Sequence, residues 1–146
     1  MNALPVKNSM GAVYSNIKLT NASDDAMIRR GVLAPKHLRQ HEEKGLVDTG
    51  AVHLVISEQI AKKLGLQILD HQGVEFADGR KDTVGVTEGI LIECEGRQTT
   101  EDALVVGSGI LIGQVILEKL DLHVDCRQQR LIPNPDHPDY PLTYIK

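Results

Sequence analysis

The sequence predicts a small all-β domain, a barrel or a sandwich, on three observations. Short apolar runs recur along the chain at regular intervals, and several alternate with polar residues as strands do. Turn signals such as Asp78-Gly79 separate these runs. The chain has 146 residues, 41% of them hydrophobic, which is enough for one core. Because it has one Phe, three Tyr and no Trp, aliphatic side chains must fill that core.

The first part of the chain predicts two strands and an ambiguous polar segment. Residues 11–20 alternate in polarity and indicate a half-buried strand. Residues 21–25 have turn chemistry, and residues 27–33 predict a second strand that Pro35 ends. Residues 37–44 favour a strand or a loop. On a helix, His37 and His41 would share a face at metal-binding spacing, but nothing nearby completes such a site, so we expect no metal.

The remainder predicts short strands with two short helices between them. The first helix begins after Ser57, a good N-cap, and ends at Gly65. A hairpin over residues 74–86 turns at Asp78-Gly79. The turn between strands 90–94 and 103–106 is expected at Gly96-Arg97. The other predictions are strands at 54–56 and 110–112, a second helix at 115–120, and a last hairpin formed by 122–125 and 131–132.

These elements place one domain at residues 11–132. Residues 1–10 carry little pattern, and we expect a loose N-terminal segment there. Residues 133–146 contain four prolines, which predict a stiff, extended C-terminal tail.

Composition argues against several classes of partner. The net charge is −4 and no block of Lys and Arg occurs, so we expect no nucleic-acid binding. No apolar run reaches membrane-spanning length, and residues 1–10 lack the apolar stretch of a secretion signal, so we expect a cytoplasmic protein that does not bind membranes. Cys94 and Cys126 form no C-x-x-C pair; reduced thiols are expected, with one disulfide as the alternative.

The most informative stretch is Leu46-Val47-Asp48-Thr49-Gly50-Ala51, in which an apolar run ends in a carboxylate. A carboxylate at the end of a buried strand is costly unless it is hydrogen-bonded or used in chemistry. Thr49 adds a hydroxyl, and Gly50 allows close backbone approach or unusual dihedral angles. This is the residue pattern that a catalytic acid on a rigid turn requires.

Three features in order resemble the retropepsin-like aspartic proteases, the single-domain relatives of pepsin, in their bacterial form. They are Val47-Asp48-Thr49-Gly50-Ala51 before an apolar strand, the hairpin 74–86 as a flap, and Leu111-Ile112-Gly113 before a short helix. The resemblance covers about residues 11–132. It implies a closed β-barrel-like acid protease fold with two short helices and one lobe per chain.

The resemblance also implies roles for individual residues. Asp48 would be the catalytic acid, supported by the rest of its loop, and the flap and one strand would enclose the substrate. The supporting residues are Thr49, Gly50 and Ala51; the flap residues are Phe76, Ala77, Asp78, Gly79 and Arg80; the pocket-lining residues are Ile110, Leu111 and Gly113. Since the chain has one Asp-Thr-Gly, the expected enzyme is a homodimer that cuts extended peptides or proteins with one aspartate from each subunit, without metal or other cofactor.

The sequence departs from the retroviral pattern at two linked positions. Retroviral members often carry an Asp after the Ala and pair it with an Arg after the later Gly, whereas this chain has Val52 and Gln114. Its flap tip is also charged. Two alternatives stay open: an inactive dimeric module of the same fold that binds peptides or acts as a scaffold, and an unrelated β-barrel in which Asp48 caps a turn.

Overall fold

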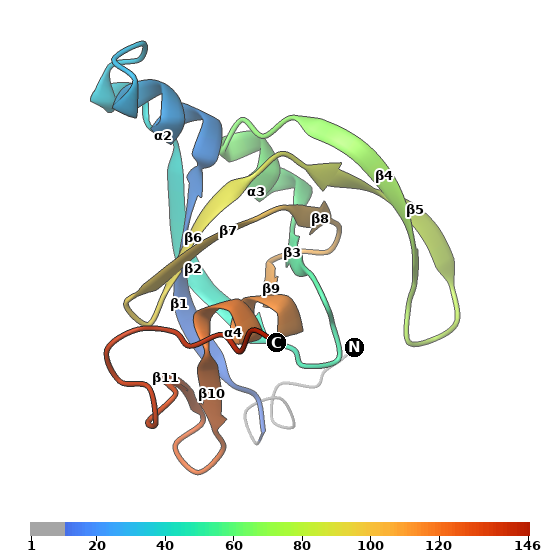
Figure 1. The fold of residues 1–146 in the computed structure, drawn as a ribbon. Helices are drawn as coiled ribbons and strands as arrows, with labels where there is room; N and C mark the ends of the chain where they lie inside the picture. The colour runs from blue at the N-terminus through green and yellow to red at the C-terminus, as the bar shows by residue number, and fades with distance from the viewer. Residues whose placement is uncertain (1–10) are drawn as a thin grey trace.

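The computed structural model describes residues 11–146, and most of their regular structure is β-sheet (Figure 1). The predicted loose segment 1–10 lies outside the described residues. The described strands are β1 (Tyr14–Asn21), β2 (Gln40–Val47), β3 (Leu54–Ile56), β4 (Ile68–Glu75), β5 (Lys81–Thr87), β6 (Ile90–Cys94), β7 (Arg97–Glu101), β8 (Ala103–Val105), β9 (Ile110–Ile112), β10 (Leu122–Asp125) and β11 (Arg130–Pro133). The helices are α2 (Ala22–Arg29), α3 (Glu58–Lys63) and α4 (Gln114–Leu120), with a 3-10 turn η1 (Pro35–His37).

Nine of these strands form one open sheet in the order β4-β5-β8-β3-β9-β2-β1-β6-β7, and β10 and β11 form a separate pair. The expected closed barrel is wrong for the described residues, because the edge strands β4 and β7 do not pair with each other. The hairpin of β4 and β5 instead curves away from the other strands (Figure 1). Nearly every residue of β4 is exposed, so its outer edge faces solvent and not a partner strand.

Helix α2 replaces the strand predicted at residues 27–33 and the turn predicted at 21–25. The Asn21 side chain caps it by accepting a hydrogen bond from Asp24 N–H at 3.0 Å. Asp25 in the first turn and Arg29 in the last complement the helix dipole. The described residues therefore contain three α-helices and not two.

Strand β7 was not predicted, because its sequence Arg-Gln-Thr-Thr-Glu has no apolar residue. The turn lies at Glu95 and Gly96, both with positive φ, so Arg97 is the first residue of β7 and not part of the turn. The Arg97 side chain is buried, and its guanidinium donates to the carbonyl oxygens of Leu120 and Asp121 at 3.0 and 2.9 Å. A polar strand is thus held against the end of α4.

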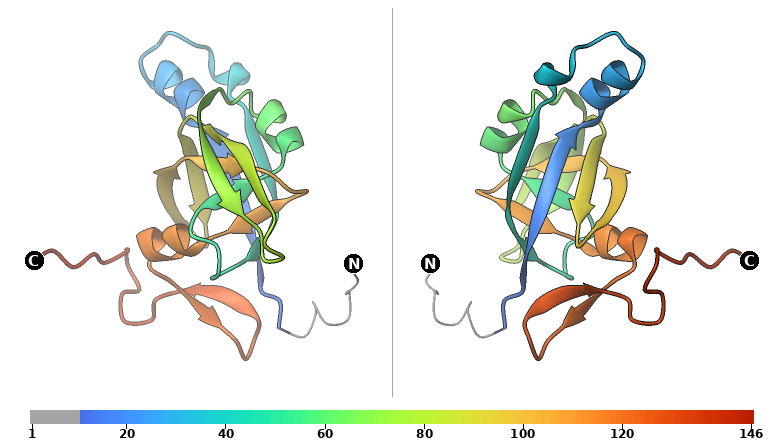
Figure 2. Two further views of the ribbon diagram at one scale, coloured as in Figure 1. Left: turned by 90° about the vertical axis from the view of Figure 1, so that its right-hand side faces the viewer. Right: turned by 90° about the vertical axis from the view of Figure 1, so that its left-hand side faces the viewer.

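The other predicted elements are confirmed with small shifts of their ends. Ser57 Oγ accepts from Ile60 N–H at 3.2 Å at the start of α3, and Gly65 follows the helix with φ of 63°. The hairpin around Asp78-Gly79 is β4 and β5, longer at its base than predicted. Figure 2 shows α2 and α3 at one end of the sheet, and α4 with β10 and β11 at the other.

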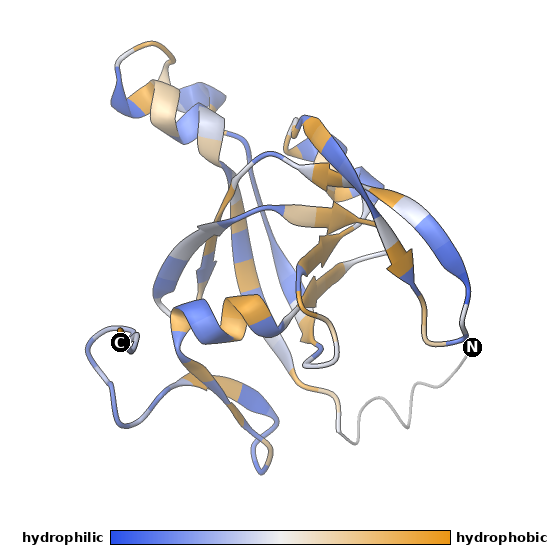
Figure 3. Cartoon of the chain, turned by 45° about the vertical axis from the view of Figure 1, so that its right-hand side comes forward, coloured by the Kyte–Doolittle hydropathy of each residue, from blue (hydrophilic) through white to orange (hydrophobic). Residues whose placement is uncertain are grey.

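The main core lies between the sheet and the helices and is aliphatic, as expected. Ile17, Leu54, Ile112 and Ile116 are completely buried in it. A second cluster, formed by Val55, Val84 and Leu104 with partly buried neighbours, anchors the base of the β4–β5 hairpin. Strands β3, β8 and β9, which are strongly apolar in Figure 3, contribute residues to both clusters.

Both cysteines are free thiols, so the disulfide alternative is not supported. Cys94 is buried in the main core and Cys126 is exposed. Burial is the main cause that raises the pKa of the Cys94 thiol. In residues 11–146, no helix is long and apolar enough to cross a membrane.

The segment after β11 is tied to the end of α4 by hydrogen bonds. Asp121, which ends α4 with φ of 52°, accepts from the Asn134 side chain, from the His137 ring and from Leu142 N–H at 3.1, 2.6 and 3.1 Å. Arg97 also donates to the carbonyl oxygen of His137. The last residues run away from the rest of the protein (Figure 2).

Candidate functional site

Asp48 directly follows β2 in a turn that is partly open to solvent. Its N–H donates to the Ile112 carbonyl oxygen at 3.0 Å, which fixes the backbone at the end of the strand. Its Oδ1 accepts from Gly50 N–H at 3.0 Å, and its carbonyl oxygen accepts from Ala51 N–H at 3.1 Å. The carboxylate is therefore oriented by its own turn, while Thr49 and Gly50 stay exposed.

The turn needs Gly50 because a larger residue would crowd the Asp48 carboxylate. Its φ is not positive, so the unusual dihedral angles that the sequence allowed are not used. A Cβ on Gly50 would lie 3.2 Å from Asp48 Oδ1, closer than most such contacts in proteins. The glycine thus leaves room for the carboxylate to fold back onto the turn.

Strand β9 holds the same loop in place from the other side. It lies between β2 and β3, parallel to β2, with Leu46 opposite Leu111, and antiparallel to β3, with Val55 opposite Leu111. The loop between β2 and β3 therefore crosses the end of β9, where α4 begins. Gln114 N–H and Val115 N–H donate to the carbonyl oxygens of residues 51 and 52 at 2.7 and 2.9 Å.

Gly113 is required by this crossing. A Cβ at this position would lie only 2.1 Å from the His53 carbonyl oxygen, and 2.8 and 2.9 Å from those of Val52 and Ala51. The hydrogen bonds between the α4 backbone and the loop also join the two segments that the retroviral Asp–Arg pair would link. Because the α4 backbone binds the loop directly, Val52 and Gln114 need no side-chain contact to join the two segments.

The flap residues form the turn of the β4–β5 hairpin, at the same end of the molecule as the loop between β2 and β3 (Figure 1). Phe76 N–H donates to the Arg80 carbonyl oxygen, and Gly79 N–H donates to that of Phe76, both at 2.8 Å. Asp78 accepts from Arg80 N–H and Nε at 3.0 and 2.7 Å, and these bonds lower the pKa of Asp78. The Arg80 guanidinium lies 4.9 Å from the centre of the Phe76 ring, so the turn is closed by its own side chains.

A cavity of about 410 Å³ joins the predicted flap to the predicted pocket strand, and Asp48 is not among its lining residues. Leu46, two positions before Asp48 and so about 7 Å along an extended chain, lines it. Phe76 of the flap and both Ile110 and Leu111 of β9 line it too, whereas Gly113 lies outside its lining. The remaining lining residues are Tyr14, Glu43, Lys44, Val55, Val106, Gly107, Ser108 and Gly109.

Several residues of this cavity were not predicted, Tyr14 and Glu43 among them. Tyr14 lies on β1 and Glu43 on β2; β2 pairs with the predicted pocket strand β9, and β1 pairs with β2. No local pattern indicated either residue, because their place in the cavity depends on the pairing of strands that are distant in the sequence.

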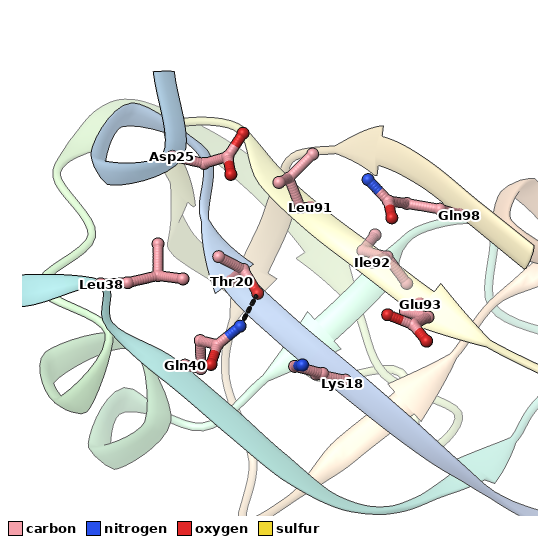
Figure 4. Close-up of a pocket in the computed structure, with 9 residues that line it drawn as sticks. All are labelled: Lys18, Thr20, Asp25, Leu38, Gln40, Leu91, Ile92, Glu93 and Gln98. Atoms are coloured by element: carbon pink, nitrogen blue, oxygen red, sulfur yellow. Dashed lines mark hydrogen bonds between the residues drawn. The ribbon is translucent and has the colours of Figure 1, made fainter. Parts of the chain in front are cut away.

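A second hollow, of about 140 Å³, lies away from the candidate site (Figure 4). It is lined by residues of β1, β2, β6 and β7, by Asp25 of α2 and by Leu38, and none of them belongs to the Asp48 loop, the flap or β9. Gln40 Nε2 donates to Thr20 Oγ1 at 3.1 Å across it. Three of its polar residues, Gln40, Glu93 and Gln98, are exposed, and we assign it no role.

The prediction of a strand or a loop at residues 37–44 is confirmed, since most of this segment lies in β2. His37 lies in η1 and His41 in β2, so the two side chains do not share a helical face. Within residues 11–146, no three side chains of His, Cys, Asp or Glu gather as metal ligands.

Comparison with known proteins adds no further assignment. No protein-family model matches the chain, and no curated protein matches it. The candidate site therefore stands on its own geometry: an oriented carboxylate that is partly open to solvent, a mainly apolar cavity lined by Leu46 of the preceding strand, and a hairpin turn that reaches the same cavity.

Proposed function

We propose that this chain is one subunit of a homodimeric aspartic endopeptidase of the retropepsin-like type. The observation that carries the proposal is the setting of Asp48. Its carboxylate is held by Gly50 N–H at the end of β2, and its backbone is held by β9; Leu46, two positions before it, lines a cavity that the flap residue Phe76 also lines. A catalytic acid needs such a fixed and accessible position.

The dimer is part of the proposal because a single chain offers one such acid. Among the described residues, the hydrogen-bond partner of the Asp48 carboxylate is Gly50 N–H in its own turn. The loop around it is open: Thr49 and Gly50 are exposed, and the apolar Val52 is 62% exposed. These features favour a second copy that covers the loop and brings its own Asp48 across a two-fold axis.

In the proposed mechanism, two Asp48 carboxylates share one proton, because two negative charges at hydrogen-bond distance are costly. The ionised carboxylate removes a proton from a bound water, and this water attacks the peptide carbonyl carbon. The protonated carboxylate donates a hydrogen bond to the carbonyl oxygen. When the C–N bond breaks, a proton passes to the leaving nitrogen.

The flap and cavity support an extended peptide as the substrate. The β4–β5 hairpin offers the substrate strand-like backbone hydrogen bonds, and its turn at Phe76 reaches the cavity lined by Leu46 and Leu111. Closure of the turn would exclude water from the reacting bond. An apolar stretch of side chain beside the cut fits the walls of this cavity.

The test is the replacement of Asp48 by Asn. Activity on an unfolded protein should fall at least about a hundredfold, because the general base is lost, while folding and dimerisation persist. Asp139→Asn is the matched control, because Asp139 is an exposed carboxylate in the tail. Circular dichroism and sedimentation check the fold and the mass, and undiminished activity of Asp48→Asn would refute the assignment.

Subunit mixing tests the shared site separately. When wild-type chains exchange with a ninefold excess of Asp48→Asn chains, about one wild-type chain in ten keeps a wild-type partner. Activity per wild-type chain should then fall to about one-tenth. Unchanged activity would show that each chain works alone. Peptide binding without cleavage by the wild type would favour the inactive-module alternative.

A further inference from the structure

The cavity between the flap turn and β9 is apolar along most of its walls but is also lined by one carboxylate that is held in place. Leu46, Val55, Phe76 and Leu111 provide apolar surface from three parts of the sheet and from the flap turn. Glu43 of β2 lines the same cavity. A carboxylate beside apolar surface favours a ligand that combines an apolar stem with a cationic end.

Glu43 is oriented by two residues behind it. Lys63 of α3 donates from Nζ to His41 Nδ1 at 2.8 Å, since an ammonium group can only donate. His41 Nε2 must then carry the ring hydrogen, and it donates to Glu43 Oε1 at 2.6 Å. This chain of hydrogen bonds from α3 to β2 fixes one oxygen of the carboxylate.

The other oxygen is free for a ligand. Glu43 Oε2 lies 3.9 Å from the place a Cβ would occupy on Gly109, in the loop that forms one wall of the cavity. Within residues 11–146, no hydrogen-bond donor is assigned to Oε2. The cavity therefore combines an apolar wall with an unpaired, anchored acceptor at its edge.

We propose that Glu43 selects peptides that place a Lys or Arg side chain in this cavity. The inference rests on the proposed peptidase function and names its substrate class. The methylene groups of the substrate side chain would lie on the apolar wall, and its cation would bind Oε2. The apolar stretch of side chain proposed above would then end in a cation.

Lys44 is the other charged residue at this cavity. It is exposed, and it makes no ion pair among the described residues, so nothing holds its ammonium group toward the cavity. Glu43 is held, with its side chain 37% exposed. The anchored charge of Glu43 therefore sets a preference for basic substrate side chains. A preference for acidic side chains, directed by Lys44, would contradict the inference.

The experiment measures kcat/KM on a positional-scanning peptide library with Lys, Arg, norleucine or Glu at each position. In the wild type, peptides with Lys or Arg at one position should exceed their norleucine counterparts about tenfold, the lower range for a charge-assisted hydrogen bond at a partly exposed site. Glu43→Gln should abolish this preference. Glu42→Gln is the matched control, because Glu42 is exposed on the same strand and does not line the cavity.

Binding separates this inference from the peptidase proposal. Fluorescence anisotropy of the same peptides on the Asp48→Asn protein should show the same basic preference, and the added Glu43→Gln change should remove it. The inference is overturned if the protein cleaves peptides with norleucine or Glu faster than those with Lys or Arg. It is also overturned if Glu43→Gln leaves a basic preference intact. In both cases the peptidase proposal stands. Basic-selective binding that depends on Glu43 without any cleavage supports the inference and overturns the peptidase. If the protein neither binds nor cleaves these peptides, both the inference and the peptidase proposal are overturned.

Discussion

Replacing Gly113 by Ala should destabilise the protein strongly, because the added methyl group would meet backbone. A Cβ there would lie 2.1 Å from the His53 carbonyl oxygen, more than about 1 Å inside an acceptable contact. The loop or the start of α4 must then move apart. That movement breaks the hydrogen bonds that Gln114 and Val115 donate to the loop at 2.7 and 2.9 Å.

The size of the effect follows from these parts. Two lost backbone hydrogen bonds cost about 1 kcal/mol each, and overpacking adds about 1–3 kcal/mol, so the loss is about 3–5 kcal/mol. This is a large share of the roughly 5–15 kcal/mol that stabilises a typical domain. For a chain of this length it corresponds to a fall in Tm of roughly 6–20 °C.

The assay is urea and thermal unfolding at one protein concentration, since dimerisation would make stability depend on concentration. Gly73→Ala is the matched control. Its Cβ would meet nothing nearer than the Asp82 carbonyl oxygen at 4.0 Å, and its effect should lie within about 1 kcal/mol of zero. A Gly113→Ala protein as stable as the wild type would refute the close crossing of the loop and α4.

Two further predictions concern the end of α4. Arg97→Met should lower the unfolding free energy in urea by about 2–4 kcal/mol, because three carbonyl oxygens lose a buried donor. Stability should also fall in acid through Asp121. The Asn134 hydrogen bond first, then those from His137 and Leu142, lower the pKa of Asp121 from 3.8 to about 2. Since the folded pKa is the lower one, its contribution is complete above pH 3.8 and is lost as the pH falls through about 2, which Tm measured from pH 5 to pH 2 should show.

Each of these predictions has its own control. Arg127→Met removes an exposed arginine and should change the unfolding free energy by less than about 0.5 kcal/mol. In Asp121→Asn, Tm should decrease less between pH 5 and pH 2 than in the wild type. Part of the decrease should remain, because the hydrogen-bonded Arg39 also lowers the pKa of Asp24. Equal losses for the two arginine variants, or superimposable acid profiles for Asp121→Asn and the wild type, would contradict the contacts described at the end of α4.

Local patterns predicted the elements whose signals lie within a few residues. Alternation located β1, Ser57 located the start of α3, and Asp78-Gly79 located the flap turn. Helix α2 was missed because the apolar pair at Met27 and Ile28 was interpreted as a strand, although Asn21 and the acidic residues after it form a good helix start. Strand β7 was missed because burial of an arginine is decided by distant carbonyl groups.

Local patterns could not predict the closure of the sheet or the full lining of the site, because both depend on contacts between segments that are distant in the sequence. Closure depends on whether β4 meets β7, and these edges lie at opposite ends of the strand order. The Asp48 loop could be located from its own residues. The role proposed for Glu43 could not be predicted from local residues, because it depends on Lys63 of a different element and on the register that brings β9 beside β2.

The insertion of β9 between β2 and β3 has a consequence for biosynthesis. Asp48 leaves the ribosome long before Ile112 does, and until then its strand lacks the neighbour that fixes it. Pairing of such distant segments is slow compared with local folding. The peptidase activity proposed for Asp48 would therefore be withheld from the nascent polypeptide, and the order of translation itself would protect the emerging chain and its surroundings.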